Sequence, residues 1–166
     1  MIPKQERNKA IVQASFDRWT SGTGDPFELL APDAQWTIVG SSPLSKTYYS
    51  RKEFMEQVSK PFNARMAQPP TRTIRGIYAD GDMVIILFDI DATGRDGLPY
   101  RNTYTWFFQM KDAKVVRATA FFDTRILQIL ESRLPEAVNW RGSLRRTNHR
   151  NSTAQFRHIA GMGCRD

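Results

Sequence analysis

VVRATAFFD, at residues 115–123, is the stretch that decides the fold, and TRIL at residues 124–127 follows it directly. Its β-branched and aromatic residues predict a strand, and the apolar residues beyond it predict a helix. Because side chains alternate along a strand, one face is expected to carry Thr119, Phe121 and Asp123, and the other Ala118, Ala120 and Phe122. Asp123 thus ends the strand, either as the N-cap of the helix or as a carboxylate whose pKa burial raises for proton transfer.

The strand period of two extends backwards from this stretch as far as residue 71. Residues 71–79, 83–93 and 100–110 are rich in β-branched and aromatic side chains and are separated by short polar turns. This pattern predicts three further strands joined as hairpins. The final helix is expected at residues 124–133 and is stopped by Pro135.

The beginning of the chain has a helical period instead. Residues 4–20 carry apolar side chains at helical spacing, which predicts an amphipathic helix. Asp25 is a plausible N-cap for a short second helix. Residues 31–33 then break the pattern before a short strand at residues 35–39.

A third helix is predicted after Ser50. Ser50 and Glu53 fit a capping box, in which each side chain satisfies a free backbone donor at the start of the helix. Pro61 is expected to weaken or end this helix. Helices followed by a run of hairpin-linked strands predict an α+β fold, in which a mainly antiparallel sheet curls over the helices.

Composition places the chain among ordinary globular proteins. Its 166 residues are 40% hydrophobic and 25% charged, which favours a single folded domain. No apolar run approaches the length of a membrane span and the N-terminus lacks the apolar core of a signal peptide, so we expect a cytoplasmic protein without membrane contact. Cys164 is the only cysteine, and His149 and His158 stand near the end. A histidine or cysteine site in the main body is therefore excluded, and we expect no metal and no cofactor.

The positive charge is concentrated at the C-terminus. Residues 1–139 have 18 Lys and Arg against 16 Asp and Glu, whereas residues 140–166 have 6 Arg against one Asp. We therefore expect a folded domain at 1–139 and a basic, poorly ordered tail at 140–166. Clustered arginines can bind nucleic acid, but the tail has no recognisable nucleic-acid motif, and a solvated extension is the favoured interpretation.

The predicted strand at residues 100–110 is where a binding site is expected. One of its faces carries Tyr100, Asn102, Tyr104, Trp106 and Phe108. Apolar walls with a few polar groups are typical of small-molecule sites, although each aromatic residue taken singly could simply pack in the core. A buried Asn102 needs partners, so it either belongs to a polar network or faces a ligand.

Five short motifs carry a resemblance to a known family. They are WTIVG at residues 36–40, KTYYSRKEF at 46–54, IYADGD at 77–82, GLPYRNTY at 97–104 and FFD at 121–123. With the order of predicted elements, they resemble the SnoaL-like proteins of the nuclear transport factor 2-like superfamily, which also holds ketosteroid isomerases, limonene epoxide hydrolases and polyketide cyclases. The resemblance spans about residues 5–133. Since this scaffold serves enzymes, binding proteins and structural modules, it implies a fold and not a reaction.

The resemblance implies a cystatin-like cone, in which the curved sheet wraps around the N-terminal helices and leaves a cavity open at one end, often in a homodimer. In SnoaL-like cyclases an Asp near the end of the last strand is the acid/base, and Asp123 occupies the similar position. Tyr48, Tyr104 or Asn102 would donate a hydrogen bond to the developing enolate oxygen. The substrate-binding wall is expected from Trp36, Phe88, Tyr104, Trp106 and Phe121.

The chain also departs from the family pattern. Lys46 and Ser50 stand where glycines are common, and Asp112-Ala113-Lys114 replaces the usual Asp-Gly turn. Tyr100-x-Asn102 stands where limonene epoxide hydrolases have an Arg-x-Asp pair, so epoxide hydrolysis is not expected.

Two hypotheses about function follow. In the first, the chain binds a small, hydrophobic, oxygenated molecule and acts as a cofactor-free isomerase or cyclase through Asp123, whose replacement by Asn would abolish turnover. In the second, it is a non-catalytic ligand-binding or assembly module whose cavity is sealed by tyrosine and tryptophan side chains. The sequence leaves open whether the protein is an enzyme.

Overall fold

The structure is a computed structural model that describes residues 1–135. The predicted domain boundary at residue 139 and the basic tail lie outside the described residues. Within them the chain has the predicted α+β fold, in which N-terminal helices pack on a mainly antiparallel sheet.

A six-stranded sheet organises the described part of the chain. Its order is β2-β1-β6-β5-β4-β3, and every neighbouring pair is antiparallel except β1 with β6, which is parallel. The parallel pair places the last strand beside the first, so β6 lies inside the sheet. The strands are β1 (Leu30–Ile38), β2 (Thr47–Tyr48), β3 (Thr71–Asp80), β4 (Met83–Thr93), β5 (Pro99–Lys111) and β6 (Lys114–Phe122).

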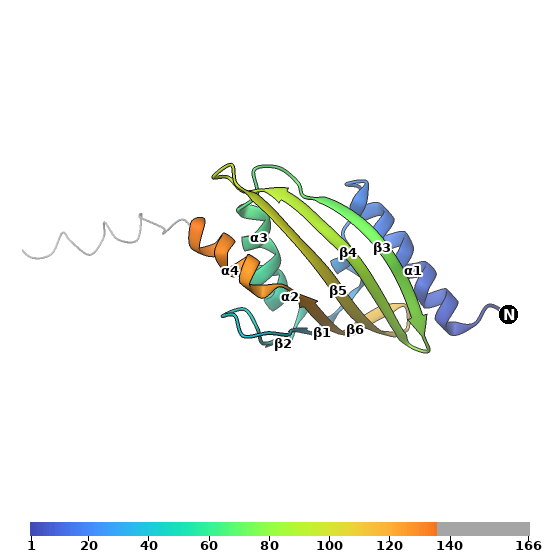
Figure 1. The fold of residues 1–166 in the computed structure, drawn as a ribbon. Coiled ribbons are helices and arrows are strands. Elements are labelled where there is room, and N and C mark those ends of the chain that lie inside the picture. The colour runs from blue at the N-terminus through green and yellow to red at the C-terminus, as the bar shows by residue number, and fades with distance from the viewer. Residues whose placement is uncertain (136–166) are drawn as a thin grey trace, which may run out of the picture. The chain divides into compact units, whose positions relative to one another are not determined.

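The helical elements pack against different strands of the sheet. They are α1 (Lys4–Thr20), the 3₁₀ turn η1 (Pro26–Leu29), α2 (Arg51–Phe54), the π-helical turn η2 (Met55–Ser59), α3 (Lys60–Ala64) and α4 (Thr124–Arg133). In Figure 1, α1 runs along β3, whereas α2, α3 and α4 lie together at the left end of the sheet. Within residues 1–135, no helix has the length and apolar character needed to cross a membrane.

Most predicted elements have the predicted bounds, and α1, β4 and α4 match to the residue. β1 is longer than expected, because it begins at Leu30 rather than at residue 35. Leu30 already pairs with Val115 of β6, and the register shifts between Leu30 and Gln35. The break expected at residues 31–33 is therefore an irregularity inside the strand.

The third helix also differs from its prediction. The capping box forms, since Glu53 N donates to Ser50 Oγ at 3.1 Å and Tyr49 N donates to Glu53 Oε2 at 2.8 Å. Pro61 was expected to weaken or end the helix, but α3 continues to Ala64. Pro61 lacks the N–H that an α-helix would use at that position, and the wider π turn Met55–Ser59 ends two residues before it.

The core is an aromatic layer between α1 and the inner face of the sheet. Phe16 of α1 lies 5.6 Å from Phe88 and 5.8 Å from Trp106 between ring centroids, and Trp19 stacks on Trp106 at 5.8 Å. On β5 the buried side chains are Tyr100, Asn102, Tyr104, Trp106, Phe108 and Met110, as the alternation predicted. This aromatic layer determines which face of each strand points into the core.

The β5–β6 turn uses backbone conformations that favour glycine. Lys111 pairs with Lys114, so Asp112 and Ala113 are the two central residues of the hairpin, with φ of 49° and 61°. Two positive φ angles define the hairpin turn in which Asp-Gly is preferred. Ala113 therefore sits in a left-handed conformation that costs a non-glycine residue about 1–2 kcal/mol.

Replacing Ala113 with Gly is expected to raise the free energy of unfolding by about 0.5–1 kcal/mol, because relief of this strain exceeds the added entropy of the unfolded chain. Urea unfolding followed by circular dichroism measures the change. The matched control is Ala10→Gly, at an exposed position of α1, which should lower the free energy of unfolding by about 1 kcal/mol. Equal losses in both variants would contradict the strained turn.

Candidate ligand-binding cavity

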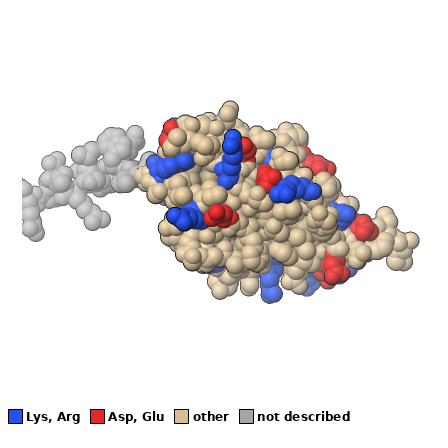
Figure 2. All heavy atoms as spheres, viewed as in Figure 1, with Lys and Arg blue, Asp and Glu red and all other residues tan. Residues whose placement is uncertain are grey.

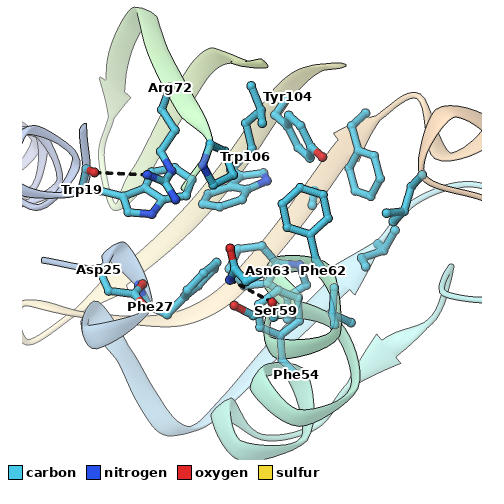
Figure 3. A pocket seen from close by; sticks show the side chains of 18 of the residues that line it. Trp19, Asp25, Phe27, Phe54, Ser59, Phe62, Asn63, Arg72, Tyr104 and Trp106 are labelled. Atoms are coloured by element: carbon cyan, nitrogen blue, oxygen red, sulfur yellow. Dashed lines mark hydrogen bonds between the residues drawn. The ribbon is translucent and has the colours of Figure 1, made fainter. Parts of the chain in front are cut away.

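A cavity of about 350 Å³ lies beside the aromatic layer and reaches the surface near Gly22, Asn63 and Pro69, which are exposed. Its wall comes from the end of α1, from η1, from the helical turns at residues 51–64, from strands β1 and β3 to β6, and from α4. Most of the wall is apolar and aromatic. Figure 3 shows Trp19, Phe27, Phe54, Phe62, Tyr104 and Trp106 around this space.

The wall contains three of the five residues expected to bind substrate, namely Trp36, Tyr104 and Trp106. Phe88 is fully buried outside the wall, where its ring stacks on Tyr104 at 5.2 Å. Sequence analysis missed further aromatic wall residues on other elements, such as Phe27 and Phe62. Their sequence signals were only those of apolar helix positions, because the cavity is assembled from segments distant in sequence.

Phe121 lies on the opposite face of the sheet from the one expected. It is 45% exposed and its ring contacts Phe107 of β5 at 5.7 Å. Phe122 lines the cavity instead, and its ring lies 4.7 Å from that of Tyr104. The expected alternation of side chains along β6 is right. The expectation that Phe121 lies on the face that meets Tyr104 and Trp106 was wrong. The inward face carries Ala118 and Ala120.

Asp123 shares the outward direction of Phe121 and does not line the cavity. Its Oδ1 accepts a hydrogen bond from Arg125 N at 3.0 Å, and the residue is the N-cap of α4. It borders a separate hollow on the outer face, together with Asp89, Asp91 and Arg101. Of the two roles that the sequence left open, the structure displays the cap, and the catalytic role stays a prediction.

Asn102 belongs to a polar network. Its Nδ2 donates to Asp123 O at 2.9 Å and to Tyr100 Oη at 3.1 Å, while Asp123 N donates to Asn102 Oδ1 at 3.1 Å. The Tyr100 and Tyr104 hydroxyls bond to each other at 2.5 Å. Burial raises the pKa of Tyr100 and raises that of Tyr104 further. The network therefore stays neutral and ties β5 to the start of α4.

Tyr48 is also satisfied within the protein. Its hydroxyl donates to Leu44 O at 2.9 Å, its ring packs against Phe54, and Lys46 Nζ lies 4.7 Å from the ring centre. Burial raises the pKa of Tyr48 to about 12. Tyr48 is not part of the cavity wall.

Two opposite charges stand in the wall. Asp25 accepts a hydrogen bond from Phe27 N at 2.8 Å, and burial raises its pKa, although the Phe27 bond and the charges of Arg51 and Arg72 oppose this. The Arg72 guanidinium lies over the Trp19 ring at 4.3 Å. Burial lowers the pKa of Arg72, and the charge of Asp25 partly restores it. Neither residue was a candidate in the sequence beyond the capping role of Asp25.

Comparison with known proteins identifies the family. The profile of the SnoaL-like domain matches residues 12–118. The chain belongs to the SnoaL-like family. This match begins within α1 and ends within β6, so it contains most of the residues that line the cavity. No curated protein matches the chain.

Solved structures support the SnoaL-like fold. An NTF2-like protein from Burkholderia thailandensis E264 is 20% identical, with a TM-score of 0.62, over 74% of this chain and 95% of that one. IdmH from Streptomyces antibioticus, a proposed polyketide cyclase, is 18% identical with a TM-score of 0.59, over 76% and 99%. TerC, co-crystallised with polyporic acid, is 19% identical with a TM-score of 0.60, over 75% and 98%. At these identities the likeness concerns the fold alone.

The capping role of Asp123 can be tested through stability. Asp123→Ala removes the acceptor for Arg125 N and should lower the free energy of unfolding by about 0.5–2 kcal/mol, whereas Asp123→Asn keeps the cap and should change it little. Asp33→Ala, at an exposed aspartate of β1, is the matched control and should stay within about 0.5 kcal/mol of the parent. Equal stability of the Ala and Asn variants at position 123 would exclude a stabilising cap.

Proposed function

We propose that this SnoaL-like protein binds a small, hydrophobic, oxygenated molecule in its aromatic cavity and performs a cofactor-free proton transfer on it, as an isomerase or cyclase does. The observation that carries the proposal is the cavity itself. At about 350 Å³ it falls in the size range of small-molecule sites, and its apolar wall has few polar groups. The type of chemistry is suggested by IdmH, the proposed polyketide cyclase that shares this fold.

The position of the carboxyl groups decides where a base could act. A proton can be removed only by a group within hydrogen-bond reach of the substrate. Asp25 and Glu131 line the cavity, whereas Asp123 lies on the outer side of the sheet. The base of the proposed proton transfer is therefore expected in the cavity wall. Trp36, Tyr104 and Trp106 contribute the binding surface.

Filling the cavity should abolish binding. Val58 lines the wall, so Val58→Trp is expected to weaken the binding of 2-tetralone, a bicyclic enolisable ketone, at least tenfold in calorimetric titration. Glu56→Trp adds the same side chain at an exposed position of the same π turn and should bind like the parent. Parent-like binding by Val58→Trp would show that the ketone binds elsewhere.

Proton transfer can be followed with the same ketone. In deuterium oxide the parent protein should accelerate exchange of the α-hydrogens of 2-tetralone, observed by proton NMR, and Val58→Trp should not. Binding without faster exchange would favour the second hypothesis, a non-catalytic ligand-binding module. Loss of exchange with intact binding in Asp123→Asn would return Asp123 to the mechanism.

We further propose that a second copy of the chain covers the outer face of the sheet, as expected from the family resemblance. Phe121 and Tyr78 are 45% and 59% exposed, and Phe107 and Leu87 are only half-buried beside them. Figure 2 shows charged side chains across the upper and middle parts of the face in view and along its lower right edge, with an uncharged area between them. Two ion pairs on the outer face, Arg75–Asp89 and Arg101–Asp91, reduce its net charge.

Light scattering coupled to size-exclusion chromatography tests this dimer. The double replacement Phe107→Glu and Phe121→Glu should convert a dimer into a monomer, since it buries four like charges across the interface. Lys52→Glu, at an exposed helix position, changes charge elsewhere and should leave the dimer intact. A monomeric parent protein would contradict the proposal directly.

A further inference from the structure

We propose that Asp25 and Arg72 form a binding site for an acidic hydroxyl group, phenolic or enolic, at one end of the cavity, where Asp25 takes the hydroxyl proton and Arg72 stabilises the resulting oxyanion. This inference rests on the proposed function, because it names the ligand group that the same cavity recognises. Both side chains line the cavity, and Figure 3 shows them at the same end, near Trp19.

The two charges interact without touching. The charge of Arg72 lowers the pKa of Asp25, and the charge of Asp25 raises the pKa of Arg72, so each favours the charged form of the other. No ion pair within residues 1–135 joins them. Asp25 is held by the cap bond from Phe27 N, and Arg72 by the face of Trp19. These separate anchors hold both residues in the cavity wall without a direct ion pair between them.

Both residues keep hydrogen-bonding capacity for a ligand. Asp25 uses Oδ1 for its cap, and within the described residues Oδ2 accepts no hydrogen bond. Arg72 makes one long hydrogen bond, from Nη1 to Trp19 O at 3.5 Å, and its buried Nε has no partner in residues 1–135. A guanidinium has five donor hydrogens, so most of them are unused. Because both charged groups are half-buried and have unused hydrogen-bonding atoms, the site favours a ligand that hydrogen-bonds to both of them.

A hydroxyl group has the chemistry that this pair requires. It donates one hydrogen bond, which suits a carboxylate, and accepts others, which suits a guanidinium. An ether or ketone oxygen can only accept and would leave Asp25 unsatisfied. A carboxylate ligand would bring a second negative charge beside Asp25. The surrounding aromatic rings then select a hydroxyl carried on a flat, apolar framework.

The proton transfer balances within the site. The O–H bond of the ligand breaks, its proton moves to Asp25 Oδ2, and the electron pair stays on the ligand oxygen. The new negative charge lies next to Arg72, while Asp25 becomes neutral. Burial favours the neutral acid and raises the pKa of Asp25, which makes the carboxylate a stronger base than one exposed to water. Return of the proton to a carbon of the enolate would complete an isomerisation.

Two probes that differ in a single donor hydrogen test the site, namely 2-naphthol and 2-methoxynaphthalene, with binding measured by equilibrium dialysis. The parent protein should prefer 2-naphthol roughly ten- to hundredfold, as expected for hydrogen bonds to charged groups. Asp25→Asn, which keeps the cap, and Arg72→Met, which keeps an apolar stem over Trp19, should each lose most of this preference. Asp33→Asn and Arg95→Met, at exposed positions of β1 and of the turn between β4 and β5, are the matched controls and should retain it.

Fluorescence of bound 2-naphthol tests the proton transfer itself. In its excited state naphthol is a strong acid, and it transfers its proton to a base within hydrogen-bond distance. The parent should show naphtholate emission, and Asp25→Asn should show emission of the neutral form. Should Arg72→Met fail to fold, Arg72→Lys replaces it, and the same loss of preference is expected since an ammonium lacks the planar fork.

The outcomes separate the two proposals. Equal affinity for both probes in the parent, or an unchanged preference in Asp25→Asn and the Arg72 variant, would overturn the hydroxyl site and leave the cavity function standing. Failure of the parent to bind either probe would overturn the proposed function and this inference together. Continued binding of 2-methoxynaphthalene by the variants shows that their cavity is intact.

Discussion

The packing of the Trp106 ring is the interaction on which the rest of the structure depends. Its ring meets aromatic rings from α1, η1 and three strands, with centroid distances from 4.8 to 6.3 Å. Aromatic side chains of this size dominate core energetics, and pairs in edge and stacked geometry add about 0.5–1.5 kcal/mol each. The ring also forms part of the cavity wall. Fold stability and the shape of the site thus depend on one side chain.

Local periodicity and capping predicted the elements well, because they depend on nearby residues. The alternation of β5 placed Tyr100, Asn102, Tyr104, Trp106 and Phe108 correctly on the buried face, and the cap pattern at Asp123 marked the end of β6. The direction of β6 was harder to predict. Phe121 is more apolar than Ala120, so hydrophobicity alone puts Phe121 inside. The pairing decides otherwise, since Ala120 lies opposite Trp106 and Ala118 opposite Phe108, where only small side chains leave room for the rings.

The site was less predictable than the fold, for a related reason. Asp25 has the sequence pattern of an ordinary N-cap, and nothing near it reveals that its carboxylate borders a cavity. The cavity beside Asp25 forms only when Arg72 of β3 packs on Trp19 of α1, and these two residues are 53 positions apart in the sequence. Asn102 illustrates the converse. Its burial was predictable from strand alternation, but whether it would serve a ligand or the backbone of Asp123 depended on where β6 ended.

The parallel pairing of β1 with β6 has a consequence for synthesis on the ribosome. The hairpins β3–β4 and β4–β5 join neighbours in sequence and can pair as they emerge. β1 is made early, yet its partner β6 is among the last strands translated, and α4 completes the cavity wall afterwards. A nascent chain that has not reached β6 therefore keeps Trp36 and Trp106 without the strand that lies between them in the finished sheet. Such a chain exposes apolar aromatic surface of the kind that promotes aggregation, until β6 has been made.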